Sequence, residues 1–250
     1  MSARLIILDI GSTLVEGPSR GPASRIAARL NLKAGEKRAL FAALMTRPFT
    51  TPQAVGDFVG ENFGQTGSDA RGAIESVWSA QEKEARPIKG AIDALDRLRN
   101  HGLRIALVSN IWYPYLLSVR RHFGSFFDDN IPPELQLFSF REGYAKPSLE
   151  LFRRALDRAR VPAHQALMVG DSYPEDVEPA ATLGIKTLWI LHRPGKEALN
   201  VVRVLNREAV PPSHALRSIS GLNLEVILSA CNHSQMVAGK IPGALRANES

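Results

Sequence analysis

The chain has 250 residues, of which 44% are hydrophobic and 22% are charged, so it can bury one sizeable core and a smaller second one. The formal net charge is +6, but the basic residues are dispersed and no aromatic-and-basic motif accompanies them. We therefore expect no nucleic-acid partner. The single cysteine, Cys231, excludes an intrachain disulfide and a multi-cysteine metal site, which favours a reducing compartment.

The first apolar run, residues 5–8, is shorter than the apolar region of a signal peptide, which spans about 7–15 residues, and Asp9 ends it. No later stretch approaches the ~20 apolar residues that are needed to cross a bilayer. We expect a cytoplasmic protein without a membrane partner. The sequence gives no indication of the oligomeric state.

The hydrophobic pattern predicts a buried strand over residues 5–8 and then a change of character. Between residues 17 and 86, helical patterns are separated by Gly and Pro, and no strand is predicted. This segment is expected to be a helical insertion. Its predicted helices, two of which begin with Pro in the first turn, are 22–30, 34–45, 52–62 and 68–84.

From residue 88 onward, strand and helix signals alternate. Such alternation predicts an α/β fold in which a parallel sheet is wrapped by helices on both faces. After residue 191 the signal fades. The predicted strands are 104–108, 135–139, 165–169 and 186–191, and the predicted helices are 91–100, 116–122, 148–160 and 174–183.

Polar side chains stand where several of these strands end. Asp9 follows the first strand, Ser109 follows strand 104–108, and Asp171 follows strand 165–169. Lys146 lies in the loop before a predicted helix, and Asp176 lies shortly after Asp171. Ligands gather at the carboxyl ends of parallel strands, so one crevice is expected to hold these residues together. Each residue alone is a weak signal, because such positions more often hold turn-forming or capping residues.

In order and spacing, these residues resemble the four motifs of the haloacid dehalogenase (HAD) superfamily of hydrolases. The resemblance is strongest in Ser109-Asn110, Lys146-Pro147 and residues 170–176. It implies a Rossmann-like, doubly wound core and an inserted C1-type helical cap that closes over the active site and selects the substrate. The implied parts are a core of residues 1–16 and 88–230, whose last strand and helix lie in 213–230, a cap of residues 17–87, and a disordered tail of residues 231–250.

The resemblance also implies a role for each motif residue. Asp9 is the nucleophile that accepts the phosphoryl group, and Ser109 hydrogen-bonds a phosphoryl oxygen. Lys146 offsets the charge of the transferring group and keeps Asp9 ionised, and Asn110 is counted with the substrate-binding residues. The implied cofactor is Mg²⁺, a hard ion that prefers oxygen ligands. Its implied ligands are Asp9, the backbone carbonyl of Gly11, Asp171 and, directly or through water, Asp176.

Gly11 departs from the pattern of the family phosphatases, which carry a second aspartate at this position as general acid and base. Such catalysis contributes about 10²- to 10⁴-fold, and glycine cannot supply it. The prediction is a Mg²⁺-dependent hydrolase for a small phosphorylated metabolite with a good leaving group, slow on simple phosphomonoesters. Three residues near the motifs in sequence are left without a role, the carboxylates as surface groups and the tyrosine as a helix-start residue: Glu16, Glu175 and Tyr173.

Other interpretations stay open. A HAD-fold protein could bind phosphate and Mg²⁺, or a protein partner, without turnover. A phosphonoacetaldehyde hydrolase would use a cap lysine as a Schiff base, for which Lys33 and Lys37 are the candidates. Metal-independent dehalogenation is disfavoured by Asp171 and Asp176. Four cap residues either line the inner face of the cap or, for the aromatic ones, form its core with the arginine exposed: Phe41, Arg47, Phe49 and Phe58.

Overall fold

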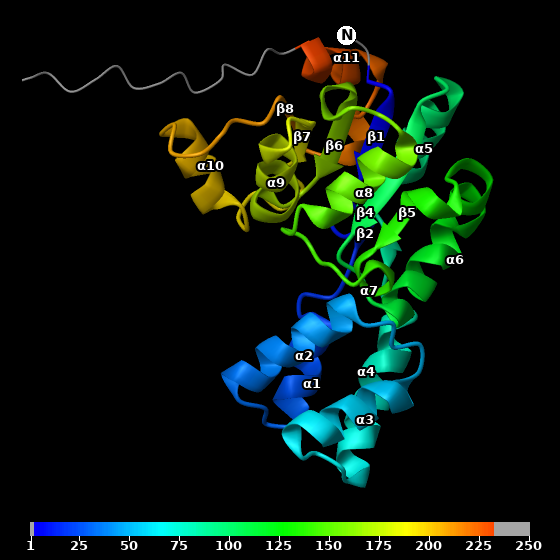
Figure 1. Cartoon of the computed structure of the whole chain (residues 1–250), viewed down its shortest axis with the longest axis vertical. Coiled ribbons are helices and arrows are strands. Elements are labelled where there is room, and N and C mark those ends of the chain that lie inside the picture. The colour runs from blue at the N-terminus through cyan, green and yellow to red at the C-terminus, as the bar shows by residue number, and fades with distance from the viewer. Residues whose placement is uncertain (1–2, 233–250) are drawn as a thin grey trace, which may run out of the picture.

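The computed structural model describes residues 3–232 of the chain (Figure 1). Its larger part is a six-stranded sheet in the order β5-β4-β1-β6-β7-β8, and every neighbouring pair is parallel. The predicted α/β fold with a parallel sheet is therefore confirmed. The strands are β1 (Leu5–Leu8), β4 (Arg104–Ser109), β5 (Gln136–Phe138), β6 (Ala166–Gly170), β7 (Lys186–Ile190) and β8 (His214–Leu216).

Helices flank this sheet, so its central strands are closed off from water. All four residues of β1 are fully buried, which is why their sequence is continuously apolar rather than alternating. The flanking helices are α5 (Ala91–Asn100), α6 (Tyr113–Asn130), α8 (Glu150–Ala159), α9 (Glu178–Thr182) and α11 (Leu224–Asn232), with the short α7 (Ser139–Glu142) and the outlying α10 (Ala198–Leu205).

Four helices form a separate group beyond one end of the sheet (Figure 1). Their apolar faces enclose a second core that includes Ile26, Leu40, Val55 and Trp78. The chain enters and leaves this group through a short antiparallel pair, β2 (Val15–Glu16) and β3 (Arg86–Pro87). The helices are α1 (Pro22–Arg29), α2 (Ala34–Thr46), α3 (Pro52–Phe63) and α4 (Ser68–Gln81).

Trp112, just before α6, belongs to the core of the helical group. Its ring packs edge-on against Trp78 of α4, with ring centroids 5.4 Å apart. Its indole N–H donates to the Gln81 side-chain oxygen over 2.8 Å. A buried indole needs such a partner, and this one ties the helical group to the sheet domain.

Several element boundaries differ from the predictions. The helix predicted at 116–122 runs from Tyr113 to Asn130, and the one predicted at 174–183 is divided into a π-helical turn, Tyr173–Val177, and α9. The sequence pattern did not predict α10, and none of the residues of this helix is fully buried. The tail predicted from residue 231 begins inside α11, and residues 233–250 lie outside the described part of the chain.

Within residues 3–232, the search for a helix with the length and apolar character of a bilayer span finds none.

Leu107 of β4 tests the energetics of the sheet core. It is fully buried, so Leu107→Ala should lower the free energy of unfolding by about 2–5 kcal/mol through lost burial and the cavity left behind. Leu205 of α10 is 74% exposed, and Leu205→Ala should change stability by less than about 0.5 kcal/mol. Urea unfolding of both variants gives the comparison; equal losses would contradict the assigned core.

Candidate active site

The sheet order places three strand ends at one point. β1 is flanked by β4 and β6, in the register Leu8 with Leu107 and Leu8 with Val169. Asp9 therefore emerges between the ends of the two neighbouring strands. The chain runs from β1 to β4 on one side and returns to β6 on the other, so this is the topological switch point where α/β proteins bind ligands.

Lys146 links two of the carboxylates. Its ammonium lies 2.7 Å from Asp9 Oδ1 and 2.5 Å from Asp176 Oδ1, and its side chain is only 2% exposed. Burial alone lowers the pKa of Lys146, but the charges of Asp176 and Asp9 outweigh it, so the pKa lies above the usual value. Lys146 is therefore cationic and holds the two acids together.

Asn110 fixes the backbone that carries Lys146. The Asn110 amide donates to the Lys146 carbonyl over 2.9 Å, and the Lys146 N–H donates back to Asn110 Oδ1 over 2.7 Å. The same amide donates to Glu175 Oε2 over 3.2 Å. One side chain at the end of β4 thus connects the lysine loop with the turn after β6.

Asp171 follows β6 directly and contacts a different cation. Arg193 Nη2 donates to Asp171 Oδ2 over 3.0 Å, and the Trp189 indole donates to the Asp171 carbonyl over 2.9 Å. Burial and the charge of Asp9 raise the pKa of Asp171 to about 6, although Arg193 opposes the shift. The carboxylate is thus held next to another acid at an energetic cost.

Asp176 is held by the turn that carries it. The Ser172 N–H donates to Asp176 Oδ2 over 3.0 Å, and the π-helical turn brings the carboxylate back over the end of β6. A Cβ atom at Gly170 would overlap the Asp176 carboxyl group, so only glycine allows this approach. Burial and the charge of Asp9 raise the pKa of Asp176, although Lys146 opposes the shift.

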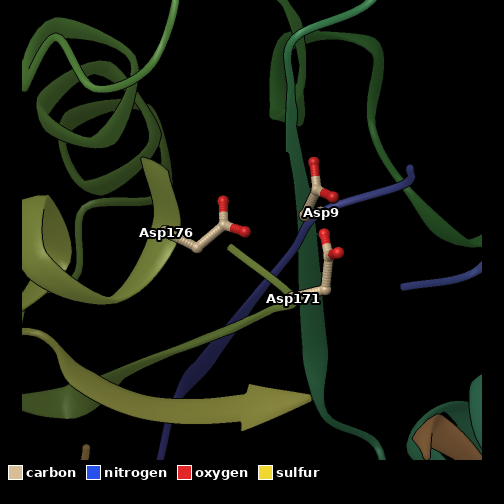
Figure 2. A group of neighbouring side chains, drawn as sticks. All are labelled: Asp9, Asp171 and Asp176. Carbon is tan, nitrogen blue, oxygen red and sulfur yellow. The ribbon is translucent and has the colours of Figure 1, made fainter. Parts of the chain in front are cut away.

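The three carboxylates fit a hard divalent cation. Asp9, Asp171 and Asp176 each offer an oxygen within 4.8 Å of the others, and all three residues are buried (Figure 2). Asp9 and Asp171 lie side by side, and Asp176 turns toward them from the next segment (Figure 2). With all three ionised, their formal charge exceeds that of Lys146 and Arg193 combined, and oxygen donors are what Mg²⁺ prefers. A cavity of about 300 Å³ opens beside them.

The loop after Asp9 turns sharply. Thr13 Oγ1 donates to Asp9 Oδ2 over 3.5 Å, and the Leu14 N–H donates to the Ile10 carbonyl over 2.8 Å. Ser12 takes a positive φ of 56°, which is uncommon for a residue other than glycine and is typical of functional sites. Gly11 lines the cavity, and a Cβ atom added there would meet no atom within 4 Å.

The Ser109 side chain is 1% exposed, and its hydroxyl makes no hydrogen bond with any described residue. Buried hydroxyls normally have a partner, so this group is available to a ligand. Ser109 and Lys146 are buried and are not among the described residues that line the cavity. Asp9, Gly11, Asn110, Asp171 and Asp176 do line it.

A second cavity, of about 290 Å³, lies between the sheet domain and the helices α1, α2 and α4. Gly11, Asn110 and Arg193 line it together with the first cavity, so the two spaces adjoin. Its far walls include Phe41 and Met45 of α2.

Two residues that line both cavities were given no role from the sequence. Glu175 is half-buried rather than a surface carboxylate, and burial raises its pKa although Lys146 opposes the shift. Arg193 follows β7 and carried no motif that could have revealed it. Of the others left unassigned, Tyr173 is buried in a small apolar cluster, and Glu16 is exposed and paired with His192 at 2.7 Å.

The four residues that were predicted to lie in a cap divide between the two predicted settings. Phe41 is half-exposed and lines the second cavity, whereas Phe58 belongs to the helical core and Phe49 packs against it. Arg47 is exposed and lies over the Phe58 ring at 4.9 Å. Neither Lys33 nor Lys37 is among the described residues that line the two cavities at the site.

The family is now clear. The model of the haloacid dehalogenase-like hydrolase family matches residues 3–184, and the chain belongs to this family of hydrolases. The predicted superfamily is confirmed.

Particular relatives match over shorter segments. A protein named haloacid dehalogenase-like hydrolase domain-containing protein 3, from Xenopus laevis, is 36% identical over 106 residues, which are 42% of this chain and 41% of the relative. A glyceraldehyde 3-phosphate phosphatase from Pyrococcus abyssi is 33% identical over 42% of each chain. A ribulose-1,5-bisphosphate 5-phosphatase from Halopiger xanaduensis is 29% identical over 52% of each. This chain matches about half or less of the length of these curated relatives.

Solved structures share the fold. A HAD family enzyme from Bacteroides thetaiotaomicron, in complex with magnesium and inorganic phosphate, has a TM-score of 0.57 and 21% identity, covering 75% of this chain and 94% of that one. A 2-haloacid dehalogenase from Pseudomonas syringae has a TM-score of 0.59 and 18% identity, covering 91% and 98%.

Removal of the Lys146 charge tests the buried ion-pair network. Lys146→Met leaves two buried carboxylates without their cation, which should cost about 3–5 kcal/mol in the free energy of unfolding. Lys37→Met, at an exposed helical position, is the matched control and should change stability by less than about 0.5 kcal/mol. Chemical denaturation without added metal measures both. A loss for Lys146→Met as small as the control would contradict the network.

Proposed function

We propose that the protein is a Mg²⁺-dependent phosphatase that acts on a small phosphorylated metabolite through an aspartyl-phosphate at Asp9. The observation that carries the proposal is the convergence of Asp9, Asp171 and Asp176 around one space, with Lys146 bonded to the first and last. The phosphatase names of two relatives support the same reaction class. We infer that residues 17–87 act as the cap that selects the substrate.

Asp9 is the group best placed to attack phosphorus. Its Oδ1 is bonded to the Lys146 ammonium and its Oδ2 accepts from Thr13, so the carboxylate is oriented. A carboxylate oxygen that attacks a phosphate ester forms an acyl phosphate, which water then hydrolyses. The buried Ser109 hydroxyl and the Lys146 ammonium are the donors available to the phosphoryl oxygens.

Asp9, the carbonyl of Gly11, Asp171 and Asp176 would hold the Mg²⁺ ion. When bound, the ion neutralises phosphate charge and fixes the orientation of the transferring group. Arg193 keeps Asp171 in place through its hydrogen bond and stands beside the cavity as a second cation. Two hydrogen bonds with the Asn110 side chain hold the Lys146 backbone in place.

Removal of the nucleophile is the direct test of activity. With p-nitrophenyl phosphate and Mg²⁺, Asp9→Asn should lower kcat by roughly 10⁴-fold or more, the scale seen when an enzyme loses its nucleophile. The exposed Asp157 provides the matched control, and Asp157→Asn should keep the wild-type rate. Phosphate release under steady-state conditions is the measurement. Equal rates for wild type and Asp9→Asn would remove Asp9 from the role of nucleophile, and no release by wild type would leave a binding protein.

Metal binding can be measured without turnover. Mg²⁺ at about 100 times its Kd should stabilise the protein by about 2.7 kcal/mol, a rise in Tm on the order of 5–10 °C for a chain of this size. Asp171→Asn should lose most of this rise, because one buried oxygen ligand has lost its charge, and Asp157→Asn should keep it. An undiminished rise in Asp171→Asn would contradict the assigned ligand set.

A further inference from the structure

The two adjoining cavities differ in chemistry. The first is lined by acidic residues and two cations, Arg193 and Lys196, and contains the nucleophile. The second has its charged lining residues, Glu175 and Arg193, only where it meets the first. A phosphate ester bound across the junction would therefore place its phosphoryl group on the acidic side and its leaving group on the other.

The far side of the second cavity is walled by apolar and aromatic side chains. Phe41 is 47% exposed on α2 and lines the cavity, so its ring is open to a ligand. Trp112 and Tyr115 contribute further rings, and Met45 adds an adaptable apolar surface. Gln81, a polar neighbour, already donates to Glu84 and accepts from Trp112. The Tyr115 hydroxyl donates to the Glu16 carbonyl. The other polar lining residues, Ser12, Asn110, Glu175 and Arg193, lie where the two cavities meet, so sugar hydroxyls on the far side would find few free partners, which disfavours a polyol there.

The volume fits one ring with substituents. A cavity of about 150 Å³ is enough to hold benzene. The second cavity measures about 290 Å³. Aromatic rings also interact favourably with one another in edge-on or offset arrangements, which favours an aromatic occupant over an aliphatic one of the same size.

Gly11 also favours an aromatic leaving group. It lines both cavities, and a Cβ atom there would enter open space, so the glycine leaves room at the junction for the leaving group. It also supplies no proton. A phenol has a pKa of about 10, as tyrosine does, so a phenolate can leave without being protonated. An aliphatic alcohol is an acid closer to water, whose pKa is about 15.7, so its alkoxide is a much stronger base and a poorer leaving group. Only the aliphatic leaving group depends strongly on a general acid.

We propose, building on the phosphatase function above, that the substrate is an aryl phosphate whose ring occupies the cavity between Gly11, Phe41, Trp112 and Tyr115. An Asp9 oxygen forms a bond to phosphorus, and the bond from phosphorus to the phenolic oxygen breaks with its electron pair on that oxygen. The phenolate takes a proton from solvent. Water then attacks phosphorus and releases inorganic phosphate and the Asp9 carboxylate, and the proton that this water loses balances the one taken up by the phenolate.

The first experiment compares leaving groups of matched size. Wild-type kcat/KM should be at least about 10²-fold higher for phenyl phosphate than for cyclohexyl phosphate, because no general acid assists the second. Gly11→Asp should narrow this ratio by raising turnover of cyclohexyl phosphate. Gly11→Asn, whose side chain has the shape of aspartate but cannot act as a general acid, should leave the ratio unchanged. A wild-type ratio within about threefold of unity would overturn the proposal.

The second experiment separates recognition of the ring from leaving-group reactivity. Acetyl phosphate has a reactive but small leaving group without a ring. Phe41→Ser should lower kcat/KM for phenyl phosphate by about 10- to 200-fold, the range for lost apolar contact in a pocket, and leave acetyl phosphate nearly unchanged. Leu199→Ser, at an exposed site on α10, is the control and should alter neither. Equal losses on both substrates, or no loss on either, would contradict the aryl site.

These outcomes are distinct from failure of the phosphatase function itself. If wild type releases no phosphate from phenyl, cyclohexyl or acetyl phosphate, or if Asp9→Asn remains as active as wild type, the phosphatase mechanism is wrong and the aryl site is wrong with it. If Asp9 is required but Phe41 is not, only the aryl site is wrong.

Discussion

The site depends on one buried ammonium shared by two acids. Lys146 reaches Asp9 and Asp176 from the loop between α7 and α8, and without its charge those carboxylates could not stand together out of water. A buried group of this kind is costly, and the fold sustains it with specific contacts. Asn110 fixes the lysine backbone, Gly170 allows the close approach of Asp176, and the Ser172 N–H holds that carboxylate.

The parallel sheet supplies the remaining order. Because β1 lies between β4 and β6, residues separated by more than a hundred positions emerge at one edge. The helical group on the far side of the β2–β3 pair then forms the wall opposite that edge. In the proposed function, catalysis and substrate selection are carried by different parts of the chain, and Gly11 and Arg193 line both cavities where these parts meet.

Much of this could be predicted from the sequence, for identifiable reasons. Apolar runs such as residues 104–108 show buried strands, and polar residues at their ends mark the edge where ligands bind. The π-helical turn at Tyr173–Val177 could not be predicted, because its wide turn follows from the packing of Asp176 against Gly170. Arg193 and Glu175 were missed because their importance comes from contacts with Asp171 and Asn110 that sequence separation hides. The sequence could not show that Phe41 is exposed and Phe58 is buried, because this depends on which face of each helix packs inward.

The central claim is that Asp9 carries the phosphoryl group between substrate and water. The most direct measurement is to quench the enzyme in acid during turnover, treat it with borohydride, and map the peptides by mass spectrometry. Because borohydride reduces an aspartyl phosphate to homoserine, the account predicts homoserine at position 9 in samples that contained substrate and Mg²⁺, and none in samples without substrate. If Asp9 stays unmodified during demonstrated turnover, and homoserine is found at another aspartate instead, the result would contradict this claim.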